Sequence, residues 1–245
     1  MFLAALLACG VAGAACHPPG PREWARVSFH YDGDTLRLAD GRRLRLLGID
    51  APEMNYHHGA PQPLAEQARA RLAQLLPRGG TVQLARDRQT HDRFGRDLAH
   101  AFRADGASVE ETLLREGLAV VFILPPNVAL TDCLLAAERA ARQARRGLWS
   151  LPDYQVQPAG TVPADGRWRR VRGRVTSAQR RADWVLLKLD RRVQLRIARR
   201  DWAAFWSADP GAWRGREVIA RGKLASRHGR PQMRLWHPAQ IELSK

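Results

Sequence analysis

Carboxylate residues gather in two short segments of the N-terminal half of the sequence. Residues 32–35 have the sequence DGDT, and Asp50 and Glu53 lie at the end of the segment 45–53, RLLGIDAPE. Two carboxylates at the ends of adjacent strands, with Gly and Pro shaping the backbone, suit a hard cation with oxygen ligands, such as calcium. A DGDT turn also occurs in hairpins for conformational reasons alone. The turn by itself is therefore weak evidence for a metal site.

Cationic residues accompany these carboxylates at positions that suit phosphate chemistry. Arg45 begins the second segment, and Arg96 ends a charged loop, residues 92–96, with the sequence DRFGR. Hydrolysis of a phosphodiester needs a metal, a base for the attacking water and cations for the phosphoryl oxygens. The guanidinium group is a planar fork that can bind two such oxygens together. The combined set therefore predicts a site for phosphodiester chemistry.

Hydrophobic patterning predicts the elements that must position these residues. Residues 25–49 alternate like strands around two tight turns, which indicates a hairpin meander. Residues 63–76 have helical spacing, with Leu64, Ala68 and Leu72 on one face. Ser108 and Glu111 have the spacing of a capping box. Two further strands, a short helix and a last helix are expected at residues 81–85, 97–103, 108–117 and 131–146.

A second set of strand-like segments follows a stretch of linker composition at residues 151–163. These segments are residues 168–175, 184–189, 193–197, 217–224 and 232–235, and a helix can be placed at 199–206. Their spacing is that of a small all-β barrel, so a domain over 24–150 should be followed by a smaller, mainly β, OB-like domain over 164–245. Six of the eight Trp residues fall in this region, where they could stack bases or simply pack.

Positive charge is concentrated in the C-terminal region. The formal net charge is +16; residues 161–245 hold 21 Lys and Arg against 7 Asp and Glu, whereas residues 1–160 hold 19 against 17. A basic domain of this kind attracts polyanions through counterion release. We expect it to tether the chain to nucleic acid without contributing a catalytic group. Because 37 of the 40 cationic residues are Arg, genome composition could also explain the charge, and the domain would then be a stabilising lid.

The N-terminal segment has the features of an export signal. Residues 2–15 are a nearly unbroken run of apolar and small residues, too short to cross a bilayer, although no Lys or Arg precedes it. We expect a signal peptide over 1–15 and a periplasmic or secreted protein. The less favoured alternatives are a buried N-terminal helix and a lipid-modified Cys16. Three Cys are too few to predict a disulfide framework, and Cys133 is interpreted as a small core residue.

Five segments together resemble the staphylococcal (micrococcal) nuclease family. They are DGDT, RLLGIDAPE, DRFGR, REGLA at residues 115–119 with a following PPN at 125–127, and GLWS at 147–150. All of them occur in the family's order and at its spacings, over about half of the chain. The resemblance implies an α+β fold, in which an OB-type five-stranded β-barrel carries three helices.

The resemblance also implies a function and a set of roles. The function is that of a calcium-dependent, endonucleolytic phosphodiesterase that acts on DNA and RNA, leaves 3′-phosphate ends, works as a monomer and needs no stable protein partner. Carried over by position, the metal ligands are the carboxylates of Asp34 and Asp50 and the carbonyl of Ala51. Glu53 is then the general base, and Arg45 and Arg96 bind the scissile phosphate.

Three places depart from the family's pattern. Ala51 replaces a Thr, which a backbone carbonyl ligand tolerates. Arg93 and Phe94 replace a Lys–Tyr pair, so the charge and the ring are kept and a hydroxyl is lost. The stretch 122–124 offers only Phe122 where the family has two tyrosines. We expect Arg93, Phe94 and Phe122 to contact the substrate, with the base preference left open.

Other classes of protein and of site fit the sequence less well. A non-catalytic nucleic-acid-binding protein on a degenerate nuclease scaffold should have lost carboxylates or arginines that are all present here. A calcium-binding envelope or adhesion protein would leave Arg45 and Arg96 without a role. His57, His58 and His91 invite a zinc site, but no Cys lies near them and the segments have loop composition.

Overall fold

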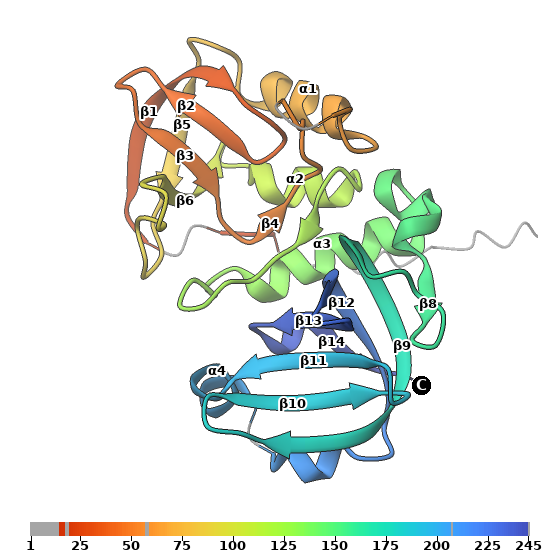
Figure 1. Ribbon diagram of the computed structural model, residues 1–245. Helices are drawn as coiled ribbons and strands as arrows, with labels where there is room; N and C mark the ends of the chain where they lie inside the picture. Colours follow the sequence, from red (N-terminus) through yellow and green to blue (C-terminus); the bar gives the residue numbers. More distant parts are fainter. Residues whose placement is uncertain (1–14, 18–19, 57–58, 207, 245) are drawn as a thin grey trace, which may run out of the picture.

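The computed structural model describes residues 15–17, 20–56, 59–206 and 208–244. Nearly all of the expected signal peptide, at residues 1–14, lies outside the described residues. In Figure 1 two β-structured units lie one above the other, and helix α3 (Thr131–Gln143) lies between them. Within the described ranges, no helix has the length and apolar character needed to cross a membrane.

The first unit is a closed β-barrel with the strand order β1-β2-β3-β6-β5. Its strands are β1 (Arg22–His30), β2 (Thr35–Leu38), β3 (Arg43–Leu46), β5 (Thr81–Ala85) and β6 (Asp97–Phe102). The β3–β6 pair is parallel and the other pairs are antiparallel. Alternation buries Leu36, Leu38, Leu44 and Leu46 inside the barrel. The predicted OB-type barrel is confirmed.

Helices cover one end of this barrel. Helix α1 (Ala65–Leu75) buries Ala68 and Leu72, close to the predicted helical face. Helix α2 (Val109–Arg115) has Ser108 as its N-cap, and Ser108 Oγ accepts a hydrogen bond from the backbone N–H of Glu111, which is one of the two bonds of the predicted capping box. The carboxylate of Glu111 accepts hydrogen bonds from Cys16 and Arg115 instead of completing the box. The short strands β4 (Ile49–Asp50) and β7 (Val120–Val121) pair with each other.

A disulfide joins the N-terminal segment to α3. Cys16 and Cys133 are bonded with their Cα atoms 5.4 Å apart, across a sequence separation of 117 residues. The backbone N–H of Cys16 also donates to Glu111 Oε2 at 2.9 Å. The interpretation of Cys133 as a simple packing residue was therefore wrong, because its sulfur is part of a covalent link. The sulfur of Cys16 is likewise not free for lipid attachment.

The second unit is also a barrel, closed by pairing between β12 and β9. Its order β9-β10-β11-β13-β12 repeats the order of the first barrel, with a parallel β11–β13 pair in the place of β3–β6. The strands are β9 (Asp165–Arg180), β10 (Trp184–Leu189), β11 (Val193–Ala198), β12 (Glu217–Arg227), β13 (Arg230–Leu235) and the flanking β14 (Ile241–Leu243). Helix α4 (Arg199–Phe205) follows β11. The predicted α+β fold with an OB-like second domain is confirmed.

The segment 151–163, for which a linker was predicted, takes part in the packing of the second unit. Strand β8 (Val156–Pro158) pairs in parallel with β9, and Ala159 and Val162 are buried in the core of the second barrel. This segment therefore connects the two units as an ordered piece of the second sheet.

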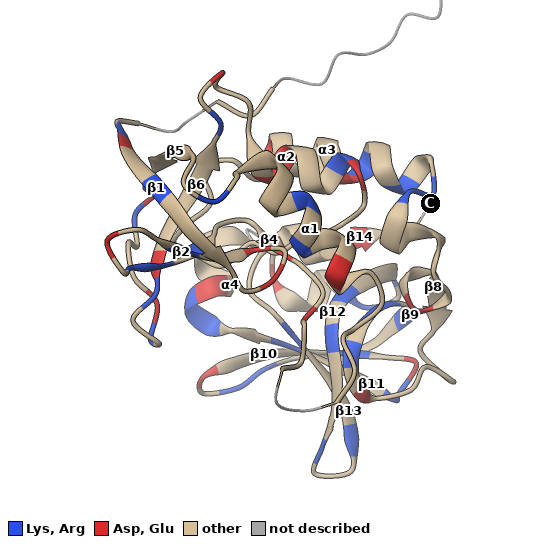
Figure 2. Ribbon diagram, turned by 90° about the horizontal axis from the view of Figure 1, so that it is seen from above, with Lys and Arg blue, Asp and Glu red and all other residues tan. Residues whose placement is uncertain are grey.

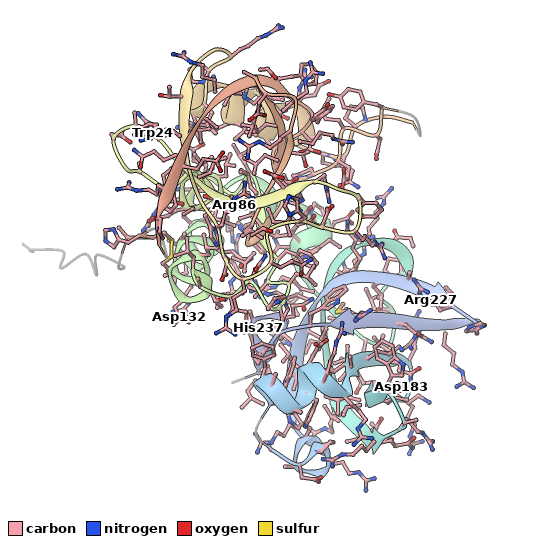
Figure 3. All side chains as sticks on the ribbon, turned by 90° about the vertical axis from the view of Figure 1, so that its left-hand side faces the viewer. Trp24, Arg86, Asp132, Asp183, Arg227 and His237 are labelled. Atoms are coloured by element: carbon pink, nitrogen blue, oxygen red, sulfur yellow. A yellow bond between two sulfur atoms is a disulfide. The ribbon has the colours of Figure 1, made fainter. Side chains whose placement is uncertain are left out.

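The two units contact each other through α3 and its flanking residues. Glu138 of α3 and Arg221 of β12 form an ion pair at 2.6 Å, with their side chains 2% and 3% exposed. Arg142 of α3 pairs with Glu242 of β14 at 2.7 Å. In Figure 3, Asp132 and His237 lie together where the units meet. Charged and aromatic contacts thus dock the second barrel against the first.

Candidate active site

The DGDT turn is held in place by its own carboxylate and by a glycine. Asp32 Oδ1 accepts hydrogen bonds from the backbone N–H groups of Asp34 at 2.9 Å and Thr35 at 2.6 Å. A Cβ atom on Gly33 would lie 2.6 Å from the Cβ of Ala68 in α1 and 2.8 Å from that of Ala51. Only glycine fits this close approach, which fixes the turn between α1 and the segment that follows β4.

Arg45 on β3 bridges the two carboxylates that the sequence singled out. Its Nη1 lies 3.0 Å from Oδ2 of Asp34, and its Nη2 lies 3.1 Å from Oδ1 of Asp50. The antiparallel register places Thr35 opposite Arg45, so the DGDT turn and the arginine lie at the same end of the hairpin. Asp34 also accepts a hydrogen bond from the backbone N–H of Ala51 at 2.6 Å. The predicted residues therefore meet at one point.

Negative charge dominates the electrostatics at this point. Burial raises the pKa of Asp34 well above its ordinary value, and Asp32 and Asp50 raise it further although Arg45 opposes them. Burial by itself would lower the pKa of Arg45, but the surrounding carboxylates, Asp34 first, outweigh burial and raise it. A cation bound between Asp34 and Asp50 would relieve the repulsion among the carboxylates. The donor set of oxygen atoms suits calcium.

Glu53 lies beside this cluster with an accessible side chain. Its backbone N–H donates to Oε1 of Gln62 at 3.1 Å, which fixes the loop without engaging the carboxylate. Partial desolvation raises the pKa of Glu53, and the negative charges of Asp32 and Asp50 raise it further. A carboxylate with a raised pKa is a stronger base near neutral pH.

The DRFGR loop brings two arginines and an aromatic ring to the same place. Asp92 organises the loop, because its Oδ1 accepts the backbone N–H groups of Phe94 and Arg96 and its Oδ2 accepts Nε of Arg96 at 2.7 Å. The Nη groups of Arg96 donate no hydrogen bond to a described residue. Arg93 and Arg96 lie over the ring of Phe94, 4.7 Å and 5.7 Å from its centroid. Phe94 itself is 68% exposed.

A single cavity of about 380 Å³ unites these groups. Its lining includes Asp34, Arg45, Asp50, Glu53, Arg93, Phe94, Arg96 and Phe122. Ala51 lines a neighbouring cavity instead. The side chains that the sequence singled out therefore line one cavity.

The second barrel contributes two residues to this site that sequence reasoning missed. Lys223 of β12 lines the cavity, with Nζ 3.6 Å from Oδ2 of Asp50. Trp236, just after β13, packs edge to face on Phe122 with the ring centroids 5.4 Å apart. A second aromatic ring therefore stands beside Phe122, but it comes from the other domain. The concentration of Trp and positive charge in the C-terminal region was the only signal for these contacts.

The zinc interpretation has little geometric support. His91 pairs with Asp97 at 3.0 Å, away from any other His or Cys ligand in the described part of the chain. His57 and His58 lie outside the described residues. Across the residues that the structure describes, no three His, Cys, Asp or Glu side chains are grouped as metal ligands. A cation at the candidate active site would therefore be held by two carboxylates and by backbone or water oxygens.

An OB-type barrel with carboxylates and guanidinium groups gathered in one cavity has the form of a nuclease domain. Residues 43–151 match the family described as "Staphylococcal nuclease homologue". An uncharacterized endonuclease of Escherichia coli is 34% identical over 132 residues, which are 52% of this chain and 78% of that protein. The chain belongs to the staphylococcal nuclease homologue family.

Two relatives from Bacillus subtilis (strain 168) each match 50% of this chain. Endonuclease YncB is 36% identical over 128 residues, which are 50% of this chain and 60% of that protein. The SPbeta prophage-derived endonuclease YokF is also 36% identical over 128 residues, 43% of its length. The chain therefore spans less than two thirds of either protein. The family match ends at residue 151, so the second barrel lies outside it.

Proposed function

We propose that this protein is a calcium-dependent phosphodiesterase that cuts DNA and RNA internally and leaves 3′-phosphate ends. The observation that carries the proposal is the convergence of Asp34, Arg45 and Asp50 at one cavity, with Glu53 and Arg96 on its walls. Membership of a nuclease family and the relatives named endonucleases support hydrolysis of nucleic acid. The choice of metal, the action on RNA and the position of cleavage rest on the resemblance of the motifs.

The site residues divide the chemistry among them. Asp34 and Asp50, with the carbonyl of Ala51, would hold calcium, which draws charge from a phosphoryl oxygen when it is bound. Glu53 would accept the proton of the attacking water. Arg45 and Arg96 would bind the phosphoryl oxygens as negative charge accumulates on them. Arg93, Phe94 and Phe122 would contact the neighbouring nucleotide.

Calcium should support cleavage of plasmid DNA better than magnesium does. Two carboxylates with backbone and water oxygens form a flexible oxygen site, whereas magnesium demands near-ideal octahedral geometry. The measurement is the initial rate with each metal after treatment with a chelator. Equal or faster cleavage in magnesium alone would contradict a calcium site, and calcium binding without any cleavage would indicate a binding protein.

We also propose a periplasmic or secreted location. The expected signal peptide supports it, and so does the bond between Cys16 and Cys133, because structural disulfides persist in oxidising compartments and are rare in reducing ones.

The second barrel carries an alternating series of aromatic and Arg side chains, which supports the proposal that it tethers nucleic acid. Arg196 and Arg234 lie 4.1 Å and 5.1 Å from the ring centroid of Trp184, and Arg234 lies 5.0 Å from that of Trp236. Among the described residues neither arginine pairs with a carboxylate. Figure 2 shows further Lys and Arg positions along β9 and β12. Since Trp236 contacts Phe122, this series begins at the candidate active site.

Replacing Arg196 and Arg234 together with Gln should flatten the salt dependence of DNA binding. For each phosphate that is no longer neutralised, the slope of log affinity against log salt should fall by about 0.7–0.9. The measurement is the dissociation constant for a long DNA at several salt concentrations in chelator. Arg227→Gln with Arg230→Gln, two exposed arginines that face each other at the outer end of the β12–β13 hairpin, is the charge-matched control. An unchanged slope in the double variant would favour a lid that only stabilises the nuclease barrel.

A further inference from the structure

A second, larger cavity lies beside the candidate active site, between the two barrels. Its volume is about 640 Å³, within the size range of ligand sites. The nuclease side supplies Asp50, Ala51 and Glu53, and the facing side includes Trp168 and Lys223. Asp50, Glu53 and Lys223 line both cavities. The second cavity therefore opens onto the carboxylates of the site itself.

The aromatic side of this cavity is rigidly held. Trp168 stacks on Tyr154 with ring centroids 5.0 Å apart and an interplanar angle of 22°. Both rings pack edge to face on Trp149, at 5.8 Å and 6.0 Å, and Trp149 is 2% exposed. The indole ring of Trp168 is half-buried and already held in place. A nucleic-acid base can therefore stack on it without the entropy cost of ordering the indole side chain. Stacking on such rings is sequence-tolerant, because every base has a π-face.

Lys223 stands at the boundary between the two cavities. Its side chain is 58% exposed, and its one ion pair among the described residues is the 3.6 Å contact with Asp50. Two positions earlier on β12, Arg221 is fixed by Glu138 of α3, so the strand that carries Lys223 cannot shift freely. A nucleic-acid strand that runs from one cavity into the other would place one of its backbone phosphates beside the ammonium group of Lys223.

We propose, on the basis of the nuclease function proposed above, that the second cavity is a subsite for the nucleotide on the other side of the scissile phosphate. The base of that nucleotide stacks on Trp168, and Lys223 binds the adjoining backbone phosphate. The first cavity, with Phe94 and Phe122, holds its neighbour. A base must leave its pairing partner to enter a cavity between two domains, so the occupant is a single-stranded segment of DNA or RNA.

Steady-state kinetics with two substrates tests this subsite. The first is a thymidine dinucleotide phosphorylated at both ends, which has a base on both sides of the phosphodiester and a further phosphate next to each base. The second is a methyl ester of thymidine phosphate, which has one base, one phosphate and no second ring. Lys223→Met should lower the preference in kcat/KM for the dinucleotide over the ester by about tenfold, mainly through KM, and Trp168→Leu should do the same. Lys223→Arg should restore most of the preference.

Calorimetric titration in the presence of a chelator is a second measurement of the subsite, and it does not depend on hydrolysis. The wild-type protein should bind the dinucleotide more tightly than thymidine monophosphate, and Lys223→Met and Trp168→Leu should remove that difference. Lys188→Met is the matched control, because Lys188 lies on β10 of the same barrel and lines neither cavity. It should leave both affinities unchanged.

The outcomes distinguish a failure of the proposed subsite from a failure of the proposed nuclease function. If the wild-type protein cleaves neither substrate but the binding difference and its disappearance in the variants are observed, the nuclease function fails and the subsite stands. If both substrates are cleaved while Lys223→Met and Trp168→Leu keep the wild-type preference and the wild-type binding difference, the subsite is wrong. A reduction that is equal for both substrates in Lys223→Met would mean that Lys223 acts only on Asp50, which also overturns the proposal.

Discussion

Replacing Glu53 with Gln should lower the turnover number on DNA by about 10²–10⁴ while leaving the protein folded. Gln keeps the shape of the side chain and cannot accept the proton of water. The fold should tolerate the change because only the backbone of Glu53, through its hydrogen bond to Gln62, takes part in the packing of the loop. The measurement is the calcium-dependent initial rate at saturating DNA, with thermal unfolding followed by circular dichroism.

The pH profile gives this prediction a second measurement. A base works only when it is deprotonated, so the wild-type rate should fall as the pH drops through the pKa of Glu53. Desolvation, Asp32 and Asp50 raise that pKa, so the loss should begin at a higher pH than for an ordinary glutamate. The E53Q variant should lack this acid limb. Glu66→Gln, an exposed position in α1, is the control and should behave like the wild-type protein. Wild-type turnover by E53Q would remove Glu53 from the role of base.

The candidate site could be predicted largely from sequence because its residues lie in short, contiguous motifs. The DGDT turn and the RLLGIDAPE segment are neighbours in one hairpin, so the local register alone brings Asp34 and Arg45 together. The DRFGR loop precedes β6, which pairs in parallel with β3 and carries Arg96 to the same end of the barrel. Each of these positions depends on the pairing of neighbouring strands. The alternation of apolar and polar residues, together with the turn residues, specifies that pairing.

The features that sequence reasoning missed depend on packing between distant segments. Lys223 and Trp236 reach the site because β12 contacts α3 and Trp236 packs on Phe122, and no local pattern specifies these contacts. The disulfide between Cys16 and Cys133 also depends on packing between distant segments. Two cysteines 117 residues apart show no sign of proximity in the sequence. The expectation that the C-terminal domain tethers nucleic acid without contributing a catalytic group treated it as an independent unit, so it gave no reason to place Lys223 at the cavity.

Replacing Arg221 with Met should destabilise the protein by about 3–5 kcal/mol. Glu138 is buried, and in the wild-type protein both of its carboxylate oxygens accept hydrogen bonds from Nη1 of Arg221, at 2.8 Å and 2.6 Å. Without the guanidinium group, the carboxylate would be left buried and uncompensated. The measurement is urea unfolding followed by circular dichroism and tryptophan fluorescence.

A double variant distinguishes the removal of one partner from the removal of the pair. Arg221→Met with Glu138→Leu removes both buried charges, so most of the stability should return, because apolar side chains of similar volume can replace a buried ion pair. Arg227→Met removes an exposed arginine from the same strand and should leave the unfolding curve unchanged. If the R221M protein instead unfolds like the wild-type protein, Glu138 is not buried in solution. The second barrel would then not be docked through this pair, and Lys223 would have no fixed place beside Asp50.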